Sequence, residues 1–127
     1  MEYLADTHTF LWFISDHPKL SAKANALIDD DQNQIRISIV SLWEIVIKSS
    51  LGKLPIQRPI SELIRELEVN DIQVLPISEN HLETLSSLPH HHRDPFDRMI
   101  VSQSLAEKLP LISADDELDC YGLQRVW

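Results

Sequence analysis

Short apolar segments that alternate with helical patterns constrain the fold of this chain more than any other sequence feature. Residues 35–39 alternate β-branched and polar side chains, which is the pattern of a strand. Further short apolar segments lie at residues 2–5, 72–77, 109–113 and 123–127. Helical patterns fill the intervals, at residues 10–14, 21–29, 41–51, 60–69, 79–88 and 94–108. This order predicts an α/β domain with a mainly parallel sheet of about five strands, covered on both faces.

Helix boundaries carry recognisable signals. Ser41-Leu42-Trp43-Glu44 matches the capping-box pattern, so we expect the helix over 41–51 to begin at Ser41. Gly52 is well placed to end that helix. Pro95, which follows Asp94, suits the first turn of the long helix.

Length and composition exclude several classes of protein. With 127 residues, of which 43% are hydrophobic, we expect a single domain over residues 1–127 rather than a disordered chain. The only glycines are Gly52 and Gly122, so a Walker loop and a Rossmann fingerprint are absent. One cysteine, Cys120, excludes an internal disulfide and indicates the cytoplasm. No signal peptide or membrane-spanning segment is expected.

The charge of the chain argues against generic nucleic-acid binding. It has 20 Asp and Glu against 11 Lys and Arg, which gives a formal net charge of −9. Generic binding of RNA or DNA requires Lys and Arg to neutralise phosphates. A local acidic site that binds metal ions remains compatible with this composition.

Acidic residues gather on the connections next to the predicted strands. Some directly follow a strand, and others lie in the first turns of helices; in chain order they are Asp6, Glu44, Asp94, Asp97, Asp115 and Asp116. If the strands are parallel, these connections share one edge of the sheet, where α/β proteins bind ligands. The sequence therefore suggests a carboxylate cluster at that edge.

Each acid also has an ordinary structural interpretation. Asp6 and Asp115 could be helix N-caps, and Glu44 could complete the capping box with Ser41. Asp94 could cap its helix or pair with an arginine four residues on, and Asp97 would suit the helix dipole. Asp116 fits a solvated cap better than a ligand. Taken singly, the acids leave the structural and chemical interpretations open.

A cluster of carboxylates has a physical requirement of its own. Two carboxylates ~5 Å apart repel each other by roughly 3 kcal/mol at an effective dielectric constant near 20. Several at one edge need protons or cations to offset this repulsion. Hard oxygen donors without cysteine suit Mg²⁺ or Mn²⁺, which can activate water and stabilise charge on a phosphodiester.

Histidines, arginines and aromatic residues near the acids allow two interpretations each. In the triplet His90-His91-His92, neighbouring side chains point apart, which disfavours a zinc site. We expect His92, Arg93 and Arg98 at the rim of the acidic pocket, where they could contact substrate phosphates; a surface role stays open. Base stacking is less expected than core or partner contacts for the aromatic residues Trp12, Phe13 and Trp43.

Four segments resemble the PIN-domain family, and more closely its VapC-like ribonuclease toxins of type II toxin–antitoxin systems. In chain order they are Leu4-Ala5-Asp6-Thr7-His8, Ser41-Leu42-Trp43-Glu44-Ile45, residues 91–100 with the run His-Arg-Asp-Pro-Phe-Asp-Arg, and Leu111-Ile112-Ser113-Ala114-Asp115. The run within 91–100 is the most specific of them. The likeness spans essentially the whole chain.

The resemblance implies a PIN-like three-layer sandwich and cleavage of RNA by water activated by Mg²⁺ or Mn²⁺. It implies a catalytic, metal-binding quartet of acids, namely Asp6, Glu44, Asp97 and Asp115. Asp94 matches a further metal-binding acid, while Thr7 and Ser113 match supporting hydroxyl residues. The implied partners are RNA, a small antitoxin protein and a second copy of the chain.

Two other functions compete with this one. A catalytically inactive PIN-like module would bind an antitoxin or RNA without cleaving it. A phosphoryl-accepting receiver domain also has an acidic pocket, but it normally carries a lysine near Ser113, where this chain has Ala114 and Asp115. The complete acidic quartet favours the ribonuclease.

Overall fold

Five parallel strands form the centre of the molecule. The computed structural model describes residues 1–54 and 56–127. The strands are β1 (Glu2–Ala5), β2 (Gln34–Ser38), β3 (Gln73–Leu75), β4 (Leu111–Ile112) and β5 (Arg125–Val126). They lie in the order β3-β2-β1-β4-β5, and every pairing is parallel. The chain therefore crosses over after each strand, and all the strands end at the same edge of the sheet.

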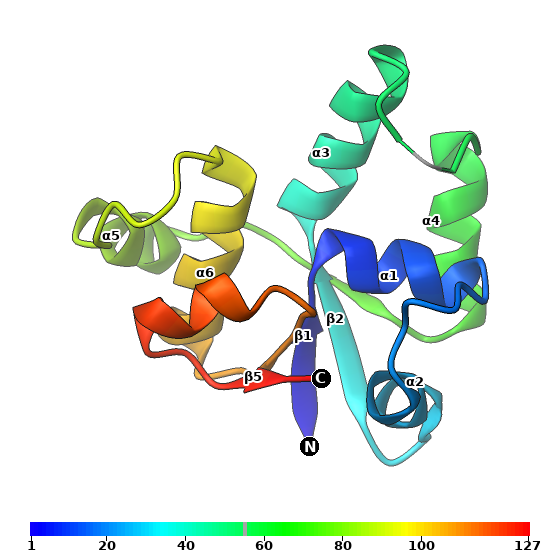
Figure 1. Ribbon diagram of the computed structural model, residues 1–127, viewed down its shortest axis with the longest axis horizontal. Coiled ribbons are helices and arrows are strands. Elements are labelled where there is room, and N and C mark those ends of the chain that lie inside the picture. The colour runs from blue at the N-terminus through cyan, green and yellow to red at the C-terminus, as the bar shows by residue number, and fades with distance from the viewer. Residues whose placement is uncertain (55) are drawn as a thin grey trace.

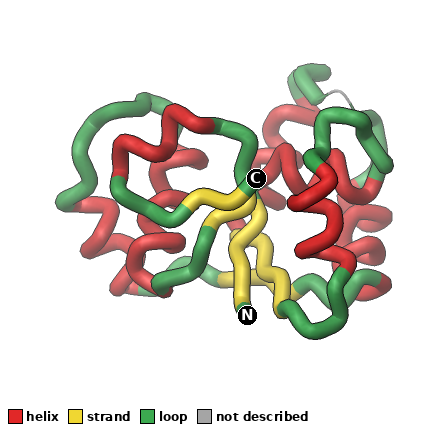
Figure 2. Tube along the Cα trace, turned by 60° about the horizontal axis from the view of Figure 1, so that its bottom comes forward, coloured by secondary structure: helices red, strands yellow, loops and turns green. Residues whose placement is uncertain are grey.

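Helices cover both faces of this sheet. They are α1 (Thr7–Ile14), α2 (Ala22–Asp29), α3 (Ile39–Ser50), α4 (Ile60–Val69), α5 (Glu79–Ser86), α6 (Pro95–Glu107) and the 3₁₀ helix η1 (Asp116–Tyr121). Figure 1 shows α1 to α4 on one side of the strands and α5, α6 and η1 on the other. Figure 2 shows the strands between the two groups of helices. The predicted three-layer α/β fold is confirmed.

The period-two alternation of the strands explains the two cores. Successive strand residues point to opposite faces. Ala5, at the end of β1, joins the core beneath α1 to α4, together with Ile35 and Ile37 of β2. Leu4, one residue earlier, joins the core beneath α6 and η1, together with Leu111. The sheet thus separates two apolar cores, as expected for a parallel sheet buried on both faces.

The start of α3 corrects the predicted capping box. The helix begins at Ile39, and its N-cap is Ser38, whose Oγ accepts a hydrogen bond from the Val40 amide at 3.0 Å. Ser41 is therefore a buried residue inside the helix, and β2 runs into α3 without a loop. The prediction for the other end is confirmed, because Gly52 follows the C-cap Leu51 with φ of +66°.

Several other boundaries differ from the sequence-based expectations by one or two residues, and two differences are larger. α1 starts three residues earlier than the predicted segment 10–14, at Thr7, because Asp6 caps it directly after β1. The 3₁₀ helix η1 was not predicted, since its acidic sequence has the composition of a loop. Among the described residues, the helices are too short and too polar for any of them to cross a membrane.

Candidate active site

Acidic side chains from separate segments meet at the carboxyl edge of the sheet. Asp6 follows β1, Glu44 lies in α3, Asp94 and Asp97 lie at the start of α6, and Asp115 follows β4. The negative charges of the other four act on Asp97. The structure therefore brings together Asp6, Glu44, Asp94, Asp97 and Asp115, which we call the acidic cluster.

Three members of the acidic cluster are also helix N-caps. Asp6 Oδ1 accepts a hydrogen bond from the Thr9 amide at 2.9 Å, and Asp115 Oδ1 accepts one from the Glu117 amide at 3.1 Å. Asp94 Oδ1 accepts from the Phe96 amide at 2.8 Å. The capping interpretation of these three acids is therefore confirmed, and each cap uses one carboxylate oxygen.

Glu44 is the most enclosed of these acids, with 3% of its surface exposed. Its Oε1 accepts a hydrogen bond from the Thr7 hydroxyl at 2.6 Å, and its Oε2 accepts one from Lys48 Nζ at 2.5 Å. The Ser41 hydroxyl lies 2.9 Å from Thr7 Oγ1. Glu44 therefore has no capping-box role, and its side chain is held by Thr7 and Lys48.

Lys48 is a member of the site that sequence reasoning missed. It stands four residues after Glu44, the spacing at which opposite charges meet on a helix, and this spacing could have revealed it. Burial opposes its charged form. The hydrogen bond to Glu44 and the charges of Glu44, Asp94 and Asp97 outweigh that effect and raise the pKa of Lys48 above its ordinary value.

Burial raises the pKa of two cluster members, and repulsion from neighbouring carboxylates adds to the rise at one of them. Burial is the largest cause at Asp97, and the charges of Asp94 and Glu44 add to it, so the pKa of Asp97 rises to about 7. Burial also raises the pKa of Asp6, although Ser113 and Thr9 oppose the rise. The surroundings thus disfavour the ionised forms of Asp97 and Asp6.

The donor set suits a hard divalent cation. All five members are carboxylates, and the oxygen donors that Mg²⁺ and Mn²⁺ prefer therefore come from four segments of the chain. Within residues 1–54 and 56–127, no three His, Cys, Asp or Glu side chains lie close enough to ligate one ion as they stand. Cap amides bind three of the carboxylates, and Thr7 and Lys48 bind Glu44, so a cation would compete with these internal contacts.

Ser113 supports the cluster from β4. It is fully buried, and its Oγ accepts a hydrogen bond from the Asp115 amide at 3.1 Å. This contact fixes the turn that carries Asp115. The neighbouring Asp116 is exposed and is the first residue of η1, where an acid is favourable for the helix N-terminus.

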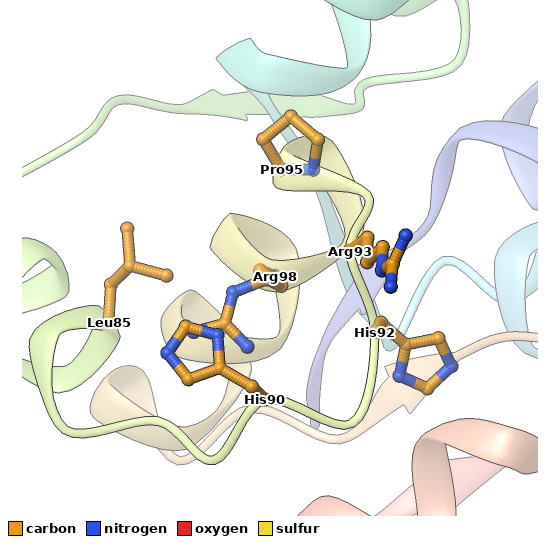
Figure 3. A pocket seen from close by; sticks show the side chains of 6 residues that line it. All are labelled: Leu85, His90, His92, Arg93, Pro95 and Arg98. Carbon is orange, nitrogen blue, oxygen red and sulfur yellow. The ribbon is translucent and has the colours of Figure 1, made fainter.

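A cavity of about 630 Å³ lies beside the start of α6 (Figure 3). Its lining is largely basic or apolar and consists of Leu85, His90, His92, Arg93, Pro95 and Arg98. Figure 3 shows the Arg98 guanidinium next to the His90 ring, with His92 and Arg93 on the far side of the loop. The three residues expected to bind substrate therefore all line one cavity, although they differ in exposure.

Arg98 is bound to backbone carbonyl oxygens, a contact that the sequence does not indicate. Only 9% of its surface is exposed, and its guanidinium donates to the carbonyl oxygens of Pro89 at 2.7 Å and Leu88 at 3.2 Å. Among the ion pairs of the described residues, none joins Arg98 to Asp94. Arg98 thus holds the loop before α6.

His92 and Arg93 follow on that loop. His92 Nδ1 lies 3.0 Å from the Tyr121 hydroxyl, which ties the loop to η1. Arg93 is exposed, and none of the ion pairs in the described ranges involves it. Arg93 is therefore the arginine of this cavity that can reach a ligand without breaking an internal contact.

The three aromatic residues considered for base stacking have different surroundings. Phe13 packs against the core beneath α1 to α4, and Trp12 contacts His17 and Trp127. Trp43 is 57% exposed and meets Phe96 edge-on, with ring centroids 5.1 Å apart. Only Trp43 combines high exposure with a position near the start of α6.

Comparisons with known proteins agree with this architecture. Ribonuclease VapC16 of Mycobacterium tuberculosis is 35% identical over 72 residues, which are 54% of this chain and 50% of that protein. The match thus spans about half the length of this relative. The structure of VapBC2 from Rickettsia felis bound to a DNA fragment from their promoter contains a chain with a TM-score of 0.75 and 18% identity. That match covers 99% of this chain and 98% of the other.

A second solved structure has the same fold. It is described as a member of the VapBC family of toxin-antitoxin systems, VapBC-5, from Mycobacterium tuberculosis, and it matches with a TM-score of 0.62 and 17% identity. The match covers 94% of this chain and 89% of that one. The sequence model of the PIN domain matches residues 3–122. This match takes in nearly the whole chain, which therefore belongs to the PIN domain family.

Proposed function

We propose that this protein is a metal-dependent endoribonuclease and the toxin of a toxin–antitoxin pair. The observation that carries the proposal is the acidic cluster, in which burial and four neighbouring carboxylates raise the pKa of Asp97 to about 7. Helix capping accounts for the positions of Asp6, Asp94 and Asp115, but the mutual repulsion of five gathered carboxylates still calls for protons or a cation to offset it. The likeness to a protein described as a ribonuclease supports RNA as the substrate.

The proposed metal ligands are the members of the acidic cluster. Asp6, Glu44, Asp97 and Asp115 form the catalytic set, and Asp94 is an additional ligand. Mg²⁺ or Mn²⁺ bound there would activate a water molecule and stabilise charge on the phosphodiester. Thr7 orients Glu44 through its 2.6 Å hydrogen bond, and Ser113 fixes the turn of Asp115.

Substrate contacts are assigned to the basic cavity beside the cluster. Arg93 is exposed and supplies the positive charge for an RNA phosphate, with His92 beside it. Arg98 contributes by holding the loop that carries both residues, through the carbonyl oxygens of Leu88 and Pro89. Because the chain as a whole is acidic, we expect weak affinity for bulk RNA.

Partner proteins form the next part of the proposal. The likeness to chains of toxin-antitoxin complexes supports a small antitoxin as a partner. Exposed apolar side chains on α3 and at its end, namely Ile39, Trp43, Val46 and Leu51, offer a surface for association with a second copy of the chain. We place the protein in the cytoplasm, because its one cysteine is free. We also propose a single domain over residues 1–127, because the strands share one sheet.

A cleavage assay on the purified chain tests this function. With single-stranded RNA, we expect cleavage in the presence of Mg²⁺ or Mn²⁺ and none after addition of EDTA. RNA or antitoxin binding without cleavage at any metal concentration would favour the inactive module instead. Cleavage that persists in EDTA would refute the metal dependence and leave the ribonuclease activity standing.

A further inference from the structure

Lys48 places a positive charge of the protein inside the acidic cluster. Its Nζ lies 2.5 Å from Glu44 Oε2, and among the ion pairs of the described residues it is the one cation that joins a member of the cluster. The charges of Asp94 and Asp97 also act on it. The charge of Lys48 would therefore repel a cation bound in the acidic cluster.

Both carboxylate oxygens of Glu44 accept hydrogen bonds from side chains. Thr7 and Lys48 together occupy both of its oxygens, at 2.6 and 2.5 Å. Asp6 and Asp94, by contrast, use only Oδ1 for their helix caps among the described contacts. The lysine is thus an internal counter-ion for the acid that has least access to solvent.

The two partners of this ion pair differ in exposure. The side chain of Lys48 is 31% exposed, whereas that of Glu44 is 4% exposed. The lysine therefore approaches the buried carboxylate from the solvent side of the site.

We propose that Lys48 is a positioning residue that holds Glu44 in place and sets the divalent-cation affinity of the acidic cluster by competing with the cation for the same negative charge. The proposal rests on the metal-dependent function given above. Like charges repel each other over the short distances within a site. At a given distance, a lysine repels a divalent cation twice as strongly as a monovalent one. Lys48 thus lowers the affinity of the site while it fixes the geometry of Glu44.

The proposal makes two predictions of opposite sign. Removing the charge of Lys48 should tighten Mn²⁺ binding by about tenfold, an increase estimated for a unit charge some 6 Å from a divalent ion in a water-like dielectric. The same change should lower the cleavage rate at saturating metal, because Glu44 loses the donor at Oε2. A merely structural lysine would not tighten metal binding when removed.

Isothermal titration of the full chain with Mn²⁺ alone tests the proposal. The variants are Lys48→Met, which removes the charge, and Lys48→Arg, which keeps it. Lys23→Met is the matched control, because it makes the same change in net charge on the exposed surface of α2. Thermal unfolding followed by circular dichroism establishes that each variant is folded, and Lys48→Gln replaces Lys48→Met if the latter does not fold.

Tighter binding by Lys48→Met, with wild-type affinity for Lys48→Arg and Lys23→Met, supports the proposal. Unchanged or weaker binding by Lys48→Met overturns it. Equal tightening in Lys48→Arg or in Lys23→Met also overturns it, because the effect would not come from a charge at this position. A wild-type chain that binds no Mn²⁺ would instead refute the proposed metal site, so the two failures are distinguishable.

Discussion

Two aspartates of this molecule show opposite responses to their surroundings. Asp119, on η1, lies against Arg125 on β5, with 2.8 Å between Oδ1 and Nε, and this hydrogen bond lowers the pKa of Asp119. Asp97, in the acidic cluster, forms none of the ion pairs in the described ranges, and burial and neighbouring carboxylates raise its pKa to about 7. An aspartate is thus stabilised in its ionised form on η1, whereas the ionised form is disfavoured in the acidic cluster.

The difference lies in where the protein places its arginines. On α4, Glu62 and Glu66 share Arg58, each at 3.1 Å. In the acidic cluster, Lys48 is the one basic partner for five carboxylates, within residues 1–54 and 56–127. Asp119 thus has an arginine partner and Glu62 and Glu66 share one, whereas the cluster keeps an excess of negative charge that an external cation could offset.

The largest expected difference between substitutions of these two aspartates is in RNA cleavage. Asp97→Asn keeps the size of the side chain but removes one proposed metal ligand, and we expect RNA cleavage to fall by roughly 100-fold or more. Asp119→Asn should retain cleavage within about twofold, because its carboxylate serves Arg125 alone. Initial rates at saturating Mg²⁺ compare the two. Equal losses in both variants would show that the acidic cluster has no special role.

A second expected effect concerns stability in the absence of metal. The folded-state pKa of Asp97, about 7, lies above the unfolded value of 3.8. The folded protein therefore binds more protons between these values, and its stability falls as the pH rises from about 4 to about 7. Asn cannot ionise, so Asp97→Asn should be more stable than the wild type above pH 7, by about 1–2 kcal/mol after allowance for partial solvent screening.

Urea unfolding in EDTA at pH 4, 6 and 8 measures this difference. It should be smallest at pH 4, which lies close to the unfolded pKa of 3.8, and largest at pH 8, where Asp97 is ionised in both states. If the stability difference between Asp97→Asn and the wild type does not change with pH, ionisation of Asp97 does not destabilise the fold.

A bound cation should offset the negative charge of the acidic cluster and thereby stabilise the fold. At a concentration some five times its dissociation constant, Mn²⁺ should stabilise the wild type by about 1 kcal/mol, which raises the melting temperature by roughly 2–5 °C. Asp97→Asn should gain less, because it has one ligand fewer. Differential scanning fluorimetry with and without Mn²⁺ provides the comparison. A rise that Asp97→Asn shares in full would place the ion elsewhere.

The smallest effect is expected at the neutralised aspartate. Asp119→Asn breaks an exposed ion pair, and such pairs contribute little, so the melting temperature at pH 7 should change by no more than about 2 °C. Because the folded-state pKa of Asp119 is lowered, its contribution is present above pH 4 and disappears as the pH falls below that. A large change at pH 7 would contradict the view that this pair is a minor surface contact.

The sequence predicts the sheet and the edge of the acidic site well, because both depend on local patterns. β-Branched alternation locates β2, and the order of strands and helices makes parallel pairing the simplest solution. Once the strands are parallel, Asp6 and Asp115 must share an edge. The convergence of acids that are far apart in sequence follows from topology and needs no knowledge of side-chain contacts.

The errors arise where tertiary contacts decide between similar local signals. Ser38 and Ser41 are both possible caps, and the pairing of Ser38 with Leu75 on β3 fixes the end of β2, and hence the start of α3. The burial of Arg98 depends on the backbone carbonyl oxygens of Leu88 and Pro89, and no side chain in the sequence signals that contact.

The cap aspartates have an evolutionary consequence. Asn caps a helix about as well as Asp, so Asp6, Asp94 or Asp115 can become Asn with little loss of the N-cap. The codons of the two amino acids differ by a single base. Under the proposed function, a folded but inactive descendant is therefore one point mutation away, and selection against a harmful nuclease can silence it without removing the protein that its partners bind.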